Sequence, residues 1–212
     1  MMLLNHQCRQ MTHLLMHVGN EDCHISDNFC GAMMTYIFYK RWDSNVARLK
    51  NFCEIAQDYD MWILSNPERS FAYNNLFWMY SPYVFLERFK DGNIILTQDE
   101  KIKIIAQKKD FKKYFSDLML LELPCKGIFC VCEKYLSDVS YKLQQMGYNY
   151  YLMYNGKSNI SFRSRTDDID CIKITTSLGI GGGHLKASGI PCNSLESAKE
   201  ITKKVVKLIC QK

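Results

Sequence analysis

A glycine-rich segment in the last third of the chain has the residue types that suit an anion. Residues 179–189 read GIGGGHLKASG, so that Gly181, Gly182 and Gly183 are followed directly by His184. Three consecutive residues without Cβ atoms let an anion approach the peptide N–H groups closely. The imidazole of His184 can add a donor or a positive charge. The segment predicts a phosphate-binding loop, with a plain turn as the alternative.

A short segment upstream of this loop ends in a cation and a hydroxyl. Residues 160–164 read as a strand, and Arg163 and Ser164 stand at its end. Residues 161–192 as a whole resemble the DHHA1 domain, the substrate-binding module of the DHH phosphoesterase superfamily, which carries an Arg-Ser pair at a strand end and a GGGH loop. The resemblance implies that six residues bind the phosphate and the end of a short nucleotide substrate: Arg163, Ser164, Gly181, Gly182, Gly183 and His184.

Two carboxylates in the first half of the chain, Asp58 and Asp60, flank one tyrosine. They suit a divalent metal only if the local backbone lets both converge, and a helix-capping or solvent-facing pair is the alternative. Residues 24–32 and 55–62 resemble the second half of a DHH catalytic domain of the nanoRNase-B-type oligoribonuclease and phosphodiesterase branch. The resemblance implies a metal, manganese in many members, bound by Asp58 and Asp60.

The upstream metal-binding motifs of that family are missing. A complete member has Asp-x-Asp, another aspartate and Asp-His-His ahead of its Gly-Ala pair, but only 30 residues precede Gly31 here. Residues 4–7 resemble a remnant of Leu-Asp-His-His in which His6 alone survives as a candidate catalytic residue. Three other histidines are alternative ligands: His13, His17 and His24. A two-metal site needs several carboxylates, so we expect an N-terminally truncated relative whose activity as an enzyme is open.

Charge and composition limit the classes of protein to consider. The net charge of +5 divides into −2 over residues 1–96 and +7 over residues 97–212. The basic half holds the glycine loop, which fits an anionic ligand, although a solvated lysine-rich surface is the alternative. No apolar run approaches the ~18 residues of a membrane span, and residues 1–17 are too interrupted for a signal peptide. We therefore expect a cytoplasmic protein without membrane contacts and with reduced cysteines.

The spacing of apolar residues predicts an α/β protein in two parts. Residues 1–123 are expected to form a partial, mainly helical DHH portion, and residues 124–212 an α/β DHHA1 domain. Helices are predicted over 31–38, 46–56, 71–89 and 98–120, then over 133–146, 167–177 and from Asn193 onward. Strands are predicted over 128–132, 148–154 and 159–163, with a hairpin turn at Asn155-Gly156.

The resemblance implies metal-dependent phosphodiester hydrolysis of short oligonucleotides or nucleotides, with Arg163 and the GGGH loop holding the phosphate. Two alternatives stay open: a non-catalytic nucleotide- or RNA-binding protein, and one subunit of a split phosphoesterase. The expected ligand is a short oligonucleotide or nucleotide. Helices left without their sheet would expose apolar surface, so a second polypeptide or a second copy is a further expected partner.

Overall fold

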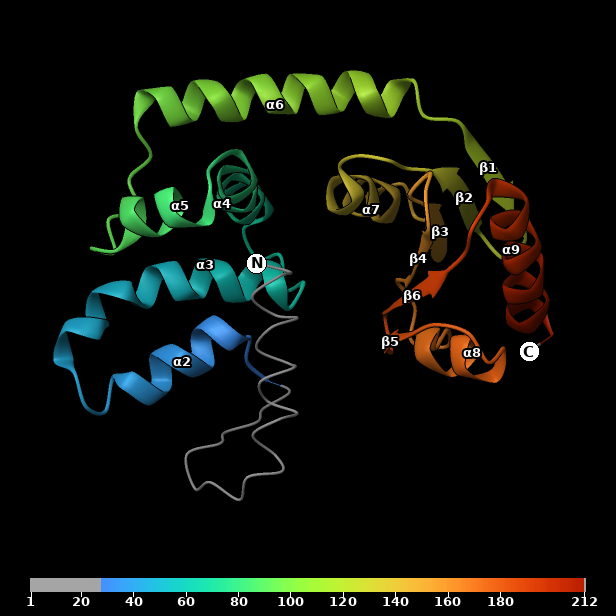
Figure 1. Cartoon of the computed structure of the whole chain (residues 1–212), viewed down its shortest axis with the longest axis horizontal. Coiled ribbons are helices and arrows are strands. Elements are labelled where there is room, and N and C mark those ends of the chain that lie inside the picture. The colour runs from blue at the N-terminus through green and yellow to red at the C-terminus, as the bar shows by residue number, and fades with distance from the viewer. Residues whose placement is uncertain (1–27, 212) are drawn as a thin grey trace. The chain divides into compact units, whose positions relative to one another are not determined.

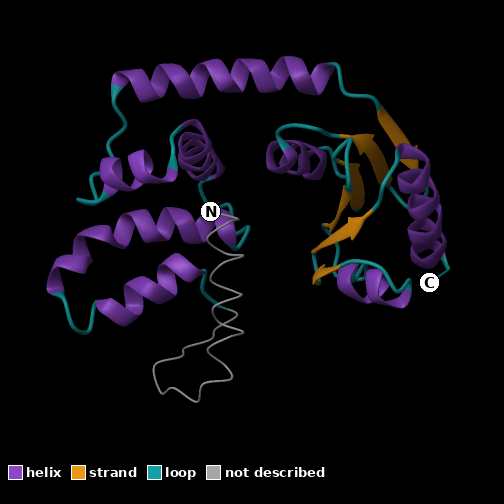
Figure 2. Ribbon diagram, viewed as in Figure 1, coloured by secondary structure: helices purple, strands orange, loops and turns teal. Residues whose placement is uncertain are grey.

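The computed structural model describes residues 28–211 and has a mixed α/β architecture, as predicted (Figure 1). These residues divide into two compact units, one ending at Gln107 and the other beginning at Lys108. The first unit is helical, and the described strands all lie in the second (Figure 2). The division falls earlier than the expected boundary at residue 124, because residues 120–123 form a strand of the second unit's sheet.

The N-terminal unit is built from short helices: α2 (Gly31–Tyr39), the 3-10 helix η1 (Ser44–Leu49), α3 (Lys50–Asp60), α4 (Pro67–Met79), α5 (Pro82–Phe89) and the start of α6 (Gln98–Ser116). The single helix predicted over 71–89 is wrong. Ser81 interrupts it in an extended conformation, and its hydroxyl accepts a hydrogen bond from the Val84 N–H. Pro82 then occupies the first turn, where proline is tolerated. The helix predicted to reach residue 120 ends at Ser116.

Aromatic residues form much of the core of this unit. Phe52 stacks on Phe89 with ring centroids 5.5 Å apart, and Phe85 lies 4.8 Å from the same ring. Other large apolar side chains remain at the surface, among them Trp42 and Tyr83, which are 78% and 73% exposed. This agrees with the expected uncovered apolar surface, while a partner polypeptide stays a prediction.

The C-terminal unit contains a six-stranded sheet in the order β1-β2-β3-β4-β6-β5. Its strands are β1 (Leu120–Leu123), β2 (Gly127–Val131), β3 (Tyr150–Tyr154), β4 (Asn159–Ser164), β5 (Gly182–His184) and β6 (Ala187–Pro191). Helix α7 (Leu136–Gln145) connects the parallel pair β2 and β3, and the other pairs are antiparallel. The strands predicted around β2, β3 and β4 are confirmed. The sequence did not predict β1 or the hairpin that the glycine loop forms from β5 and β6.

The two faces of this sheet are covered differently. Helices α8 (Cys171–Ser177) and α9 (Leu195–Cys210) pack on one face, which we call the covered face, around a core that includes Phe162 and Ile190. Helix α7 packs on the opposite side over β2 and β3 (Figure 1). Along β4 the side chains alternate between buried and half-buried, so this strand has one enclosed and one accessible side.

Two expectations about the ends of this unit are corrected. Helix α9 is capped by Ser194 rather than Asn193, because the Ser194 hydroxyl accepts a hydrogen bond from the Ser197 N–H at 3.1 Å. Cys125 and Cys210 form a disulfide, contrary to the expectation of reduced thiols. The cysteines that are free in residues 28–211 are buried, as expected of small apolar side chains. None of the described helices has the length and hydropathy needed to cross a membrane.

The glycines of the loop differ in what the fold requires of them. Gly181 and Gly183 have φ angles of +70° and +153°, which disfavour other residues. A Cβ atom would lie 2.2 Å from the Gly189 carbonyl oxygen at Gly181, and 2.3 Å from that of Ala187 at Gly183. At Gly182 a Cβ atom would meet no heavy atom within 4 Å. The close approach of β6 therefore requires glycine at positions 181 and 183. Packing gives no reason for a glycine at position 182.

We expect Gly181→Ala to destabilise the chain and Gly182→Ala to leave its stability nearly unchanged. The first substitution combines a positive φ with overpacking against the backbone of β6, at a cost of about 2–4 kcal/mol. The second places its methyl group in open space. Urea unfolding of both variants measures the difference. Equal free energies of unfolding would show that the strand contact does not constrain this loop.

Candidate functional site

The register of three neighbouring strands brings three of the six expected phosphate-binding residues, Arg163, Gly182 and His184, onto one face of the sheet. Residues directly opposite one another in an antiparallel pair project from the same face, and alternate residues along a strand share a face. The pairing of β4 with β6, and of β6 with β5, produces two adjacent rows: Arg163–Ala187–His184 and Ser161–Gly189–Gly182. We call this group of six residues the phosphate face.

The phosphate face is accessible and its middle strand carries only small residues. The β4 and β6 members are half-buried and the β5 members are exposed. Ala187 lies between Arg163 and His184, and Gly189 lies between Ser161 and Gly182, so that neither row has a large side chain at its centre. Two strand spacings separate Arg163 from His184, which places their backbones about 10 Å apart. Their side chains can therefore reach a small anion between them.

Ser161 is a member of the site that the sequence analysis missed. The Nε atom of Arg163 donates a hydrogen bond to the Ser161 hydroxyl at 3.3 Å, which helps to orient the guanidinium along the strand. Ser164 lies on the covered face, where it is 7% exposed and donates its hydroxyl to the Thr166 carbonyl at 2.8 Å. The two-residue period of a strand would have identified Ser161, rather than Ser164, as the neighbour of Arg163.

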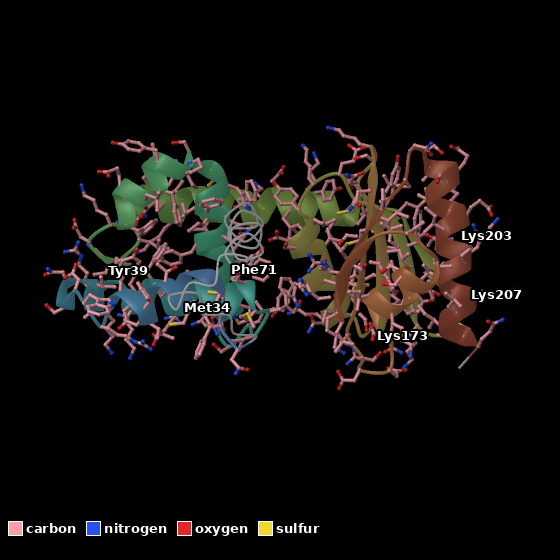
Figure 3. The ribbon with its side chains drawn as sticks, turned by 60° about the horizontal axis from the view of Figure 1, so that its bottom comes forward. Met34, Tyr39, Phe71, Lys173, Lys203 and Lys207 are labelled. Carbon is pink, nitrogen blue, oxygen red and sulfur yellow. A yellow bond between two sulfur atoms is a disulfide. The ribbon has the colours of Figure 1, made fainter. Side chains whose placement is uncertain are left out.

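The charge of this unit does not by itself point to the phosphate face. Lys203 and Lys207 lie along the outer side of α9, and Lys173 lies on α8, the helices of the covered face (Figure 3). Lys186, in the β5–β6 turn, forms an ion pair with Asp167 at 2.6 Å. Burial raises the pKa of Tyr151, next to Arg163 across β3 and β4, and the positive charge of Arg163 opposes that rise. On the phosphate face, Arg163 supplies a positive charge and His184 supplies an imidazole.

Asp58, the expected metal ligand, is buried and hydrogen-bonded within the N-terminal unit. Its carboxylate is 4% exposed and accepts hydrogen bonds from the Ser65 N–H at 2.7 Å, the Ser65 hydroxyl at 2.6 Å, the Asn66 N–H at 3.2 Å and the Ser70 hydroxyl. Burial tends to raise the pKa of Asp58, but the bonds from Ser65, Ser70 and Asn66 lower it overall. A carboxylate offers about four acceptor positions, so all of them are occupied.

This carboxylate holds together the turn between α3 and α4. Trp62 and Leu64 in that turn have φ angles of +56° and +53°, which cost about 1–2 kcal/mol each in residues other than glycine. A metal ion at Asp58 would have to displace donors that stabilise this strained turn. The described residues therefore do not fit a manganese centre at Asp58. Asp58 is not a helix cap or a solvent-facing side chain either, because the N-cap of α4 is Asn66 and Asp58 is buried.

The remaining candidate ligands are not brought together in the described part of the chain. Asp60 is half-buried at the end of α3, and its charge adds to burial in raising the pKa of Cys30. His6 lies outside the described residues, as do the alternatives His13, His17 and His24. Among residues 28–211 no three histidine, cysteine, aspartate or glutamate side chains are placed to hold a metal ion.

No protein-family model and no curated protein matches this chain. Solved structures similar to parts of it include a pGpG-specific phosphodiesterase from Vibrio cholerae, with a TM-score of 0.44 and 11% identity over 62% of this chain and 52% of that protein. An exopolyphosphatase-related protein from Bacteroides fragilis has a TM-score of 0.41 and 12% identity over 84% of this chain and 56% of that protein. An uncharacterized protein from Helicobacter pylori G27 has a TM-score of 0.30 and 16% identity over 88% of this chain and 68% of that protein. This chain therefore spans about half the length of the first two proteins.

Asp58→Asn should lower the free energy of unfolding at pH 7 by about 2–4 kcal/mol, because an amide nitrogen cannot accept the bonds that the carboxylate oxygen accepts. The pKa of Asp58 is lowered in the folded state, so its contribution is complete above its ordinary value of 3.8 and is lost as the pH falls through the folded-state value. The variant should therefore lose less stability than the parent on acidification.

Urea unfolding at pH 7 and below pH 4 measures both effects. Asp60→Asn is the matched control, two residues away on the same helix and outside this network of bonds. A free energy of unfolding that is the same for Asp58→Asn and the parent at pH 7 would contradict the structural role.

Proposed function

We propose that this chain binds the terminal phosphate of a short nucleotide or oligonucleotide on the phosphate face. The observation that carries the proposal is the cross-strand row in which Arg163 and His184 flank a single alanine. An arginine fork can hold two phosphate oxygens at once. The imidazole can donate to a third oxygen, and the small residues between them allow the anion to approach the sheet.

The geometry supports binding more strongly than it supports hydrolysis. The resemblance to the DHH phosphoesterase superfamily rests on the segment that forms β4, α8, β5 and β6, and this segment holds the phosphate face. Asp58 is bonded to four donors of its own unit, which argues against its use as a metal ligand. We therefore propose that this chain is a non-catalytic nucleotide- or RNA-binding protein. Manganese-dependent phosphodiester hydrolysis, which the resemblance implies, is the alternative to this proposal.

Arg163→Ala should weaken the binding of the 5′-phosphorylated diribonucleotide pApA by about 1.5–3 kcal/mol, or about 10- to 150-fold, as expected for the loss of a charged hydrogen bond. Arg165→Ala is the matched control, because Arg165 bonds to the Tyr148 carbonyl and the Asn149 side chain. Calorimetric titration of both variants gives the dissociation constants.

The dinucleotide ApA, which lacks the 5′-phosphate, separates phosphate recognition from recognition of the bases and sugars. If the 5′-phosphate is what is recognised, the affinity of the parent for ApA should be no higher than the affinity of Arg163→Ala for pApA. Equal affinities of the parent and Arg163→Ala for pApA would remove its basis.

The purified chain should show no manganese-dependent hydrolysis of pApA above the buffer background, because the candidate ligand Asp58 is held by protein donors. Chromatographic detection of released mononucleotide with and without manganese measures this. Turnover by the parent that is lost in Asp58→Asn, under conditions where the variant is folded by circular dichroism, would show that the chain is a metal-dependent phosphoesterase.

A further inference from the structure

The phosphate face continues beyond its two rows toward Asn159. On its other side, His184 and Ala187 form the last pair of the β5–β6 hairpin, and the hairpin turn follows. In the opposite direction, Asn159 pairs with Pro191 at the next position of β4 on the same face. A nucleotide whose phosphate lies between Arg163 and His184, and which stays on the sheet, therefore extends toward Asn159.

The side chain of Asn159 leans over the middle strand of this face. A Cβ atom built on Gly189 would lie 3.6 Å from the Oδ1 atom and 3.8 Å from the Nδ2 atom of Asn159, so the amide stands beside Gly189. Asn159 is half-buried, and the next residue, Ile160, is 0% exposed in the core of the covered face. The amide therefore projects from the phosphate face, where it borders the row of Ser161, Gly189 and Gly182.

The hairpin turn between β3 and β4 uses the backbone of Asn159. Its N–H donates to the Oδ1 atom of Asn155 at 3.0 Å, and its carbonyl accepts from the Asn155 N–H at 2.9 Å. These bonds hold the turn without the side-chain amide of Asn159. An asparagine amide has an NH₂ group that donates and a carbonyl oxygen that accepts. At this position it can therefore exchange both kinds of hydrogen bond with a ligand.

Two glycines side by side leave space next to this amide. Gly189 pairs directly with Gly182 across β6 and β5. A Cβ atom at Gly182 would meet no heavy atom within 4 Å, and one at Gly189 would meet the Asn159 amide at ordinary van der Waals distances. The surface between the amide and the edge of the sheet is thus bare backbone, which a ring of the ligand can approach closely.

The part of a nucleotide that reaches this space is the sugar. Ala187, at the centre of the phosphate row, and Gly189, beside the amide, are two residues apart, or about 7 Å along the strand. In a 5′-nucleotide the ribose is joined to the phosphate through its 5′-carbon, and the base lies beyond the ribose. With the phosphate in the row of Arg163 and His184, the ribose lies over the glycine row, and its hydroxyl groups are within reach of Asn159.

We propose that Asn159 is a specificity-determining residue that binds the 2′-hydroxyl of the nucleotide carrying the terminal phosphate, so that the site prefers ribonucleotides to deoxyribonucleotides. This inference rests on the proposed function. A hydroxyl both donates and accepts, and the amide supplies one atom of each kind. In an oligonucleotide the 3′-oxygen of this ribose belongs to the next phosphodiester, so the 2′-hydroxyl is the free one. It is also the group by which a protein distinguishes RNA from DNA.

Asn159→Ala tests this role with pApA and with d(pApA), the same dinucleotide without its 2′-hydroxyls. The parent should bind pApA about 3- to 10-fold more tightly than d(pApA), as expected for one uncharged hydrogen bond. Asn159→Ala should lose this preference by binding pApA more weakly, while its affinity for d(pApA) stays that of the parent. A merely structural role would weaken the binding of both ligands equally, so comparing the two ligands isolates the contact.

Ser158→Ala is the matched control. Ser158 is the exposed residue next to Asn159, and its bonds to Asn155 and Cys192 are made by its backbone. Calorimetric affinities are compared at a temperature where urea unfolding shows both variants to be folded. A sugar preference that is present in the parent and in Ser158→Ala, and absent from Asn159→Ala, supports the inference.

Three other outcomes overturn it. If the parent has no sugar preference, or if Asn159→Ala keeps it, Asn159 does not bind the 2′-hydroxyl, while weaker pApA binding by Arg163→Ala leaves the proposed function standing. Titration with pUpU separates the sugar from the base: an effect of Asn159→Ala that occurs with pApA and not with pUpU indicates a contact with the base. If the parent binds none of these dinucleotides, both the inference and the proposed function are overturned.

Discussion

The phosphate face depends on how closely the backbones of β5 and β6 approach each other. Gly181 and Gly183 permit this approach, since a Cβ atom at either position would lie within 2.3 Å of a backbone oxygen of β6. The approach adds a sixth strand to the sheet, and the register of that strand places His184 in the same row as Arg163. A constraint on backbone packing thus brings together a guanidinium and an imidazole that are 21 residues apart in the sequence.

The polar side chains singled out in the two units differ in how far the fold encloses them. Asp58 is enclosed by four donors and stabilises a turn with two positive φ angles. Glu100 in the same unit is 1% exposed and forms an ion pair with Arg88 at 2.8 Å, which joins α6 to α5. Arg163 and His184 project instead from an accessible face whose neighbours are small. Asp58 and Glu100 are thus enclosed by bonding partners within their unit, whereas Arg163 and His184 lie on an accessible face of the sheet.

Local patterns predicted the elements better than they predicted the site. The apolar runs of β2 and β3, which are buried on both faces, were sufficient, as were the periodic patterns of β4 and α9, which bury one face. The Ser81-Pro82 interruption was missed because the apolar pattern continues through it. Ser164 was assigned to the site by resemblance, although the period of a strand places it on the covered face with its side chain against Thr166. The donors around Asp58 come from a turn and a second helix, and no local pattern could have shown that they converge on it.

The most direct test is a two-dimensional ¹H–¹⁵N NMR titration of the labelled chain with pApA, and with ApA as the ligand that lacks the 5′-phosphate. Binding at the phosphate face predicts that pApA shifts the amide signals of Gly182, Gly183, His184 and Arg163, and that ApA leaves them in place. Exposed residues of α9 on the covered side should be unaffected by either ligand. Shifts confined to the lysines of α9, or equal shifts with both dinucleotides, would contradict the account.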